Sequence, residues 1–333
     1  MADELLDEIE SLGARLLDAR GAIGTRIIGQ DRVVELTLAA MLSGGHALLM
    51  GLPGLGKTRL VETLSTVMGM TGNRIQFTPD LMPSDILGAE VLETAADGSR
   101  SFRYIEGPIF AQLLMADEIN RASPRTQSAL LQAMQEREVT VAGQTRKLPA
   151  PFHVLATQNP IEQEGTYPLP EAQLDRFLVK IDVDYPDRET ERAIVLATTG
   201  LEEGEARHVF DAEGLMAAQQ VVRRMPVGES VVELILDLVR ACRPEQDEAP
   251  ESVKRHVAWG PGPRAAQALM LLVRAQALLE GRLAPDPTDV ARLARPVLGH
   301  RMALSFAARA EGVSLEQVID EVSSRVTRVE QAA

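Results

Sequence analysis

One short segment, GLPGLGKT at positions 51–58, combines residue types and spacing that could hold a phosphate group. It satisfies the pattern G-x-x-x-x-G-K-[ST], whose glycines let backbone N–H groups curve around phosphate oxygens without Cβ clashes. In this pattern Lys57 reaches the β- and γ-phosphates, and the hydroxyl of Thr58 binds Mg²⁺. An apolar run precedes the segment and a helical pattern follows it, so a helix N-terminus would face the same anion. The segment predicts a nucleotide site, with the candidate residues Gly51, Pro53, Gly54, Leu55, Gly56, Lys57 and Thr58.

Two adjacent carboxylates, Asp117 and Glu118, end the apolar run LLMA at positions 113–116. In phosphate-loop enzymes an acid at this place holds the Mg²⁺ shell, which is the role expected of Asp117. Glu118 would then polarise the attacking water. An acid pair at a strand end can also be merely solvated, and the phosphate loop upstream favours the catalytic interpretation.

The elements that must position these residues follow from the periodicity. Apolar runs at 47–50, 113–116 and 153–156 predict buried strands, and helical patterns at 58–68 and 126–135 separate them. Strands alternating with helices predict a parallel sheet with helices on both faces. Two segments interrupt the alternation: strand-like pieces between 86 and 105 around Asp97-Gly98, and a hairpin at 139–146 that turns near Ala142-Gly143.

The chain changes character after about Pro186. Helical patterns replace strands, at positions 189–198, 231–242, 264–280, 287–294 and 315–326. The N-terminal residues of the chain have leucines at helical spacing on one side and acidic residues on the other. We therefore expect an N-terminal helix at 1–25, an α/β nucleotide-binding core at 26–186 and a helical lid at 187–333, with no separate substrate-recognition domain.

Composition excludes several classes of protein. The 333 residues include 34 Lys and Arg against 48 Asp and Glu. The resulting net charge of −14 argues against sequence-independent binding to duplex DNA and against binding to an anionic membrane. Cys242 is the only cysteine and the five histidines are scattered, which excludes a disulfide framework and a cysteine-based zinc site. The start lacks a signal-peptide pattern, and no apolar run approaches the roughly 18 residues of a membrane span. A cytoplasmic protein is expected.

The motifs GLPGLGKT, ADEINRA, ATQNP and YPLPEAQLDRF together resemble those of MoxR-type AAA+ ATPases, from about residue 27 to about residue 301. The resemblance implies an AAA+ core with a small helical lid, in which the two interruptions are the helix-2 insertion and the hairpin before sensor 1. It also implies ATP and Mg²⁺ as ligands, with hydrolysis to ADP and phosphate. The N-K-x-D pattern of GTPases is absent from the sequence, which agrees with ATP.

The resemblance also implies roles for single residues. The segment Ile28-Gly29-Gln30 resembles the one that contacts adenine, and Asn159 resembles the sensor-1 residue that orients water with Glu118. Arg176 resembles the arginine finger, which reaches the γ-phosphate bound by a neighbouring subunit. Arg264 resembles the sensor-2 arginine of the lid, although Gly262 stands where a small polar residue is expected.

Simpler roles remain open for these residues. Asn159 could simply begin a turn before Pro160, and each arginine could form a surface salt bridge or start a helix. Arg121 and Arg125, just after Glu118, could face the seam between subunits, although a structural or solvated role is favoured.

The function implied is that of a chaperone-like remodeller of protein complexes, working as a homo-oligomeric ring of six. Its partner is expected to be a protein with a von Willebrand factor A domain. Hydrolysis is expected to change the angle between the core and the lid at a hinge near Pro186.

The alternative is a ring-shaped nucleic-acid motor, for which basic residues near the insertions could line a pore. The acidic balance and only 3% aromatic residues weaken it. A nucleotide-gated scaffold without turnover is disfavoured by the presence of Asp117, Glu118, Asn159 and Arg176. The basic residues near the insertions are Arg100, Arg103, Arg146 and Lys147.

Overall fold

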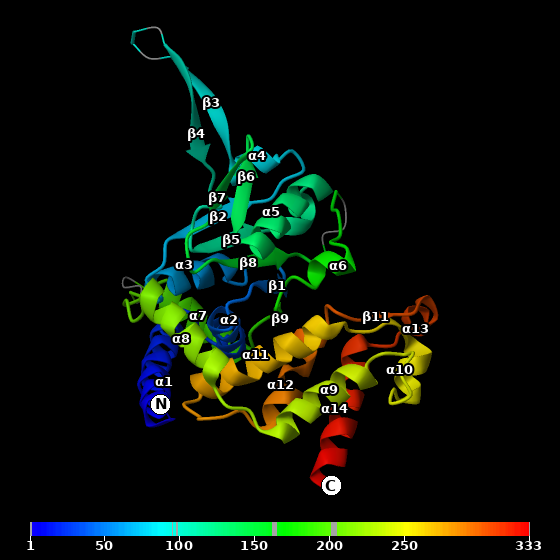
Figure 1. Ribbon diagram of the computed structural model, residues 1–333. Coiled ribbons are helices and arrows are strands. Elements are labelled where there is room, and N and C mark those ends of the chain that lie inside the picture. The colour runs from blue at the N-terminus through cyan, green and yellow to red at the C-terminus, as the bar shows by residue number, and fades with distance from the viewer. Residues whose placement is uncertain (1, 95, 98, 162–164, 201–204, 333) are drawn as a thin grey trace.

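The computed structural model describes residues 2–94, 96–97, 99–161, 165–200 and 205–332. A parallel sheet of five strands forms its centre, and the three predicted apolar runs are its three inner strands (Figure 1). The expected parallel sheet is therefore confirmed, with two further strands at its edges. In spatial order the strands are β2 (Gly72–Gln76), β5 (Leu113–Asp117), β8 (His153–Gln158), β1 (Ala47–Gly51) and β9 (Val179–Val183).

The two faces of the sheet enter two hydrophobic cores, because successive side chains on a strand point to opposite sides. On β1, Leu48 packs with Leu130 and Leu131 of the helix on one face, whereas Leu49 belongs to the core on the other face. The helices thus cover both faces, as expected. They are α5 (Pro124–Glu136) on the first face, and α1 (Ala2–Gly24), α2 (Asp31–Leu42) and α3 (Lys57–Val67) on the second.

Both expected insertions are antiparallel hairpins. The larger hairpin projects away from the body of the molecule (Figure 1), and the turn predicted at Asp97-Gly98 includes Gly98, which lies outside the described residues. The guanidinium of Arg146 in the smaller hairpin lies 4.1 Å from the ring centroid of Tyr104 in the larger one, so the two insertions touch. The elements are α4 (Pro83–Leu87), β3 (Gly88–Thr94) and β4 (Arg100–Glu106), then β6 (Glu138–Val141) and β7 (Gln144–Lys147).

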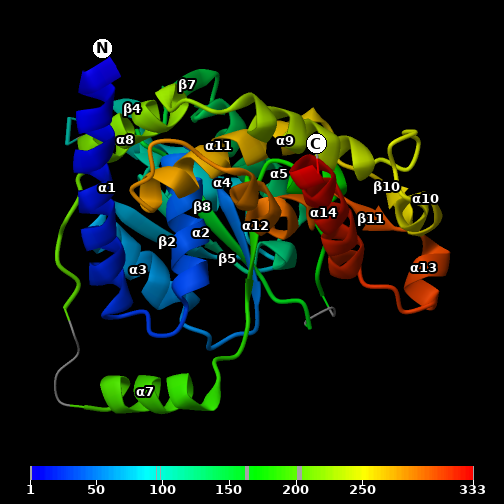
Figure 2. The same cartoon turned by 90° about the horizontal axis from the view of Figure 1, so that it is seen from below.

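Helices dominate the chain after residue 186, and one short antiparallel pair of strands lies among them. Figure 2 shows α7 apart from the other helices of this half, and none of its residues is buried. Within the described residues, no helix is both long and apolar enough to cross a bilayer. The elements are α7 (Arg188–Thr198), α8 (Ala212–Arg224), α9 (Glu229–Ala241), α10 (Glu251–His256), β10 (Val257–Trp259), α11 (Pro263–Leu279), α12 (Pro287–Leu298), β11 (Ala303–Leu304), α13 (Phe306–Ala310) and α14 (Leu315–Ala332).

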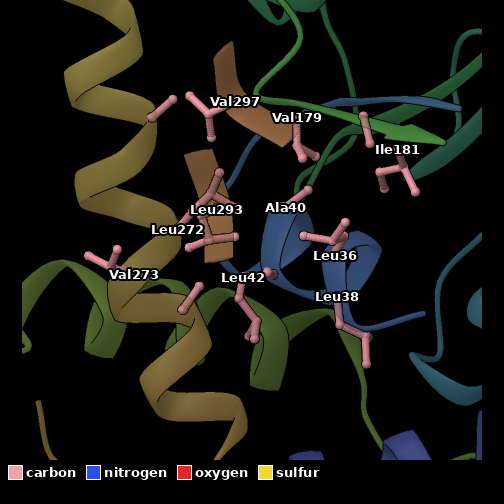
Figure 3. Packing of buried hydrophobic residues seen from close by; sticks show 14 of the residues in the cluster. Leu36, Leu38, Ala40, Leu42, Val179, Ile181, Leu272, Val273, Leu293 and Val297 are labelled. Atoms are coloured by element: carbon pink, nitrogen blue, oxygen red, sulfur yellow. The ribbon is translucent and has the colours of Figure 1, made fainter. Parts of the chain in front are cut away.

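One hydrophobic core continues from the sheet into the C-terminal helices. Figure 3 shows Leu36 of α2 and Ile181 of β9 together with Leu272 of α11 and Leu293 of α12, all in one buried cluster. The change near residue 186 therefore separates two kinds of secondary structure within a single core. A hinge at Pro186 that moved the helices as one body would have to divide this core, so the packing does not support that expectation.

Candidate active site

The predicted phosphate loop connects β1 to the first turn of α3. Gly54 and Gly56 have φ values of +83° and +74°, in the left-handed region that favours glycine. The Nζ atom of Lys57 donates to the carbonyl oxygens of Gly51 at 2.6 Å and Leu52 at 3.1 Å, so the side chain lies along the loop. Partial burial lowers the pKa of Lys57, and the nearby carboxylates of the acid pair oppose that shift.

One hydroxyl group contacts both residues of the acid pair at the end of β5. Thr157 Oγ1 on β8 donates to Oδ1 of Asp117 at 2.6 Å and accepts from the backbone N–H of Glu118 at 2.9 Å. The second oxygen of Asp117 accepts from Nη2 of Arg74 at 2.7 Å. Thr157 and Arg74 are thus contacts of the site that the sequence reasoning does not single out. Only the ATQNP motif, which contains Thr157, signals one of them.

Glu118 has an unusual backbone conformation, and its side chain accepts hydrogen bonds from two neighbouring side chains. Its φ of 56° and ψ of 49° lie in the left-handed region, which is uncommon for a residue other than glycine and often occurs at functional sites. Its Oε2 atom accepts from Nε2 of Gln76 at 2.8 Å and from Nη1 of Arg121 at 3.0 Å. Arg121 therefore contacts the predicted catalytic carboxylate of its own subunit.

Asn159 follows the last residue of β8. Because β8 lies between β5 and β1, its carboxyl end meets the same edge of the sheet as the phosphate loop and the acid pair. Oδ1 of Asn159 accepts from the backbone N–H of Ile161 at 3.1 Å, which fits the turn before Pro160. The structure thus brings Lys57, Asp117 and Asn159 to one edge of the sheet.

A pocket of about 620 Å³ lies beside the phosphate loop and is lined mainly by apolar side chains. Pockets of this size and character hold small molecules and cofactors. Ile28 and Gln30 line it, and Nε2 of Gln30 donates to the carbonyl oxygen of Leu55 at 2.9 Å, which fastens the predicted adenine segment to the loop. Gly29 has a φ of +72° and lies so close to Thr190 of α7 that a Cβ atom would meet its methyl group at 2.1 Å.

Arg176 and Arg264 lie together, away from the phosphate loop. They line a different pocket of about 220 Å³, and Nη1 of Arg264 is 3.6 Å from Oδ2 of Asp175. Arg176 follows α6 (Glu171–Leu174), and the backbone N–H of Leu178 bonds to the carbonyl of His46 at the amino end of β1. This pocket therefore lies at the amino edge of the sheet, about 16 Å from the carboxyl edge for a strand of five residues.

The residues expected to bind Mg²⁺ suit that ion. Mg²⁺ usually takes one or two protein oxygens and completes its octahedron with waters and substrate phosphates. Thr58 offers a hydroxyl oxygen and Asp117 a carboxylate at the same edge of the sheet. Within the described ranges, no group of three or more His, Cys, Asp or Glu side chains could hold a metal by itself. The donor set thus fits a metal that arrives with phosphates.

Comparisons with known proteins identify the family of the chain. Residues 46–179 match the model of the ATPase family associated with various cellular activities (AAA), and residues 250–322 match the AAA lid domain. Chaperone MoxR1 of Mycobacterium tuberculosis is 42% identical over 325 residues, which cover 98% of this chain and 84% of the relative. Protein MoxR of Paracoccus denitrificans is 33% identical, covering 88% of this chain and 90% of that protein. A solved structure from Cytophaga hutchinsonii, provisionally assigned as an ATPase, superposes with a TM-score of 0.88 at 36% identity over 95% of both chains. On this similarity, which runs over nearly its whole length, the chain belongs to the MoxR family of AAA+ ATPases.

Proposed function

We propose that this protein hydrolyses ATP to remodel protein complexes, as a chaperone-like ring whose active sites are each shared between two subunits. One observation carries the proposal. The phosphate loop and the acid pair lie at the carboxyl edge of the sheet, whereas Arg176 and Arg264 lie together at the amino edge. One subunit therefore carries the two halves of an ATPase site on opposite edges, and a head-to-tail contact would join them.

Within one subunit, the carboxyl edge supplies the binding half of the site. The apolar pocket beside Ile28 and Gln30 receives the adenine, and the loop N–H groups and Lys57 hold the phosphates. Thr58 and Asp117 are the proposed protein ligands of Mg²⁺, which would neutralise negative charge on the phosphates. Glu118 takes up a proton from the attacking water, which Asn159 helps to orient.

The neighbouring subunit supplies the second half. An arginine aimed at the transferred phosphoryl group stabilises the charge that develops on it, and such a residue contributes about 10³-fold or more to hydrolysis. Arg176 is proposed for this role, and Arg264 lines the same pocket and would approach the same nucleotide. A repeated head-to-tail contact that closes on itself makes a ring, for which the family resemblance suggests six subunits.

The proposed client is a protein complex rather than a nucleic acid. The name of the mycobacterial relative, a chaperone, supports this choice, and the family resemblance suggests a partner with a von Willebrand factor A domain. Two basic residues of the insertions are engaged within the hairpins, because Arg103 pairs with Glu93 and Arg146 lies over Tyr104. Together with the net charge of −14, these contacts do not favour a nucleic-acid motor.

Mixing two inactive variants tests the shared site. Lys57→Ala loses nucleotide binding but keeps Arg176, whereas Arg176→Ala keeps nucleotide binding and lacks the arginine. In a head-to-tail ring mixed one to one, about one quarter of the sites combine an intact Lys57 with an intact neighbouring Arg176, so about a quarter of wild-type turnover should return.

The matched control mixes Lys57→Ala with the double variant that lacks both side chains, which creates no intact site and should stay inactive. Turnover in the first mixture that equals the sum of its two components would reject the shared site. Turnover by Arg176→Ala alone at the wild-type rate would show that the arginine finger lies elsewhere.

A further inference from the structure

The guanidinium of Arg74 lies against the carboxylate that is proposed to bind the metal. Arg74 is on the edge strand β2, and its Nη2 atom donates to Oδ2 of Asp117 at 2.7 Å. Oδ1 of Asp117 accepts from Oγ1 of Thr157 at 2.6 Å. Both carboxylate oxygens therefore have a donor before any metal binds, and one of these donors carries a full positive charge.

The same guanidinium is connected to Glu118 through Gln76. Nη2 of Arg74 also donates to Oε1 of Gln76, at 3.0 Å. Because a guanidinium has donors only, Gln76 must turn its amide oxygen toward Arg74, and its amide nitrogen then points elsewhere. That nitrogen donates to Oε2 of Glu118 at 2.8 Å. Arg74 thus contacts one carboxylate of the acid pair directly, and it sets the orientation of the amide that, together with Arg121, donates to the other.

A side pocket next to Arg74 contains a second carboxylate, that of Glu62. This pocket of about 340 Å³ is lined by residues of α3 and β2, among them Thr58, Glu62 and Arg74 itself. Thr58 and Glu62 are four residues apart, so they lie on the same side of α3. Glu62 is exposed and lines the same pocket as Arg74, so its carboxylate is available to a guanidinium that leaves Asp117.

We propose that Arg74 is a positioning residue that pairs with Asp117 while the metal is absent and moves toward Glu62 when Mg²⁺ and nucleotide bind. The inference rests on the proposed function, because it requires a metal–nucleotide complex beside Asp117. Two cations at one carboxylate repel each other, so arrival of the metal displaces the guanidinium. Its departure also removes the acceptor constraint on the amide of Gln76, while Arg121 still donates to Glu118. Arg74 in this way competes with the metal for Asp117.

The test measures metal binding instead of turnover. Mn²⁺ is titrated into the full-length chain with ADP, and free Mn²⁺ is followed by electron paramagnetic resonance. Arg74→Gln removes the competing charge and should lower the Kd for Mn²⁺ by about tenfold, a figure that allows for solvent screening at this half-exposed side chain. Glu62→Gln removes the second partner and should raise the Kd by about threefold. Arg103→Gln, which breaks the pair with Glu93 on the outer hairpin, is the matched control and should leave the Kd unchanged.

The conservative variant and a metal-free measurement separate the possible outcomes. Arg74→Lys keeps the charge and should return the Kd to within about twofold of the wild-type value. Equal ADP binding by wild type and Arg74→Gln in EDTA shows that the variant is folded. With that control met, an unchanged or larger Kd for Arg74→Gln overturns the proposal, because Arg74 would then support the metal site. Failure of the wild-type protein to bind ADP at all would instead reject the proposed ATPase function.

Discussion

Replacing Arg301 by methionine would remove a buried guanidinium that joins the C-terminal helices to the segment carrying Arg176. The side chain of Arg301 is 2% exposed, and its Nε atom donates to Oδ1 of Asp175 at 2.8 Å. Its Nη atoms donate to the carbonyl oxygens of Phe177 at 2.6 Å and Val297 at 2.7 Å. Methionine fills a similar volume without any donor, so the loss is electrostatic.

The expected loss of stability depends on the hydrogen bonds and ion pairs that the partners of Arg301 keep. Removing one member of a buried ion pair typically costs about 3–5 kcal/mol, because the other charge is left uncompensated. Phe177 keeps a hydrogen bond from Nε2 of His300 at 3.0 Å, and Asp175 keeps Arg264 at 3.6 Å. We therefore expect a loss at the lower end, about 3 kcal/mol, which raises the unfolding constant about 150-fold.

Equilibrium unfolding in urea at neutral pH measures this loss. The matched control is Arg207→Met, which removes an exposed ion pair with Asp18 and should cost less than about 1 kcal/mol. Nucleotide binding by Arg301→Met should stay at the wild-type level, because the phosphate loop lies at the opposite edge of the sheet. A loss below about 1 kcal/mol for Arg301→Met would refute the reasoning.

Three further predictions concern the acid pair and the buried histidines. Glu118→Gln should bind ATP like the wild type and lose at least about 100-fold in hydrolysis, since the amide takes no proton from water; equal rates of phosphate release would contradict the assignment. Thr157→Val removes the hydroxyl that joins Asp117 to Glu118 and should lower turnover about tenfold with a stability loss of about 1–2 kcal/mol; a normal rate would mean that the hydroxyl does not position the pair. Burial lowers the pKa of His46 to about 3 and of His153 to about 4, so the unfolded chain takes up these protons first as the pH falls. The free energy of unfolding is therefore unaffected by these histidines above about pH 6.5. Below that pH it falls by about 1.4 kcal/mol per histidine for each pH unit, until the pH reaches the folded-state pKa values. Urea midpoints that stay flat from pH 7 to pH 5 would rule this out.

The nucleotide half of the site could be predicted because its signals are local. The inner strands β1, β5 and β8 are buried on both faces, so their residues form apolar runs that periodicity detects. The edge strand β2 has the sequence GNRIQ, and only Ile75 is buried in it. A strand that exposes most of its side chains leaves no apolar run, and for that reason Arg74 and Gln76 do not stand out in the sequence.

The position of the arginines could not be predicted in the same way. The motifs indicate the residue types at Arg176 and Arg264, but neither motif fixes the edge of the sheet near which the start of α11 lies. That depends on contacts between distant segments, such as those of Asp175 with Arg264 and Arg301. The resemblance to a sensor-2 arginine therefore leaves open which subunit's nucleotide Arg264 approaches.

The hydrophobic core that continues from the sheet into the C-terminal helices also constrains how the chain is made. The phosphate loop leaves the ribosome well before Leu272 and Leu293, which belong to the same buried cluster as Leu36 of α2. Until those later helices emerge, the apolar face of α2 lacks its cover, and such exposed surface makes a nascent chain prone to aggregate. A fragment that ended at residue 186 would therefore expose the face of α2 that these later helices bury.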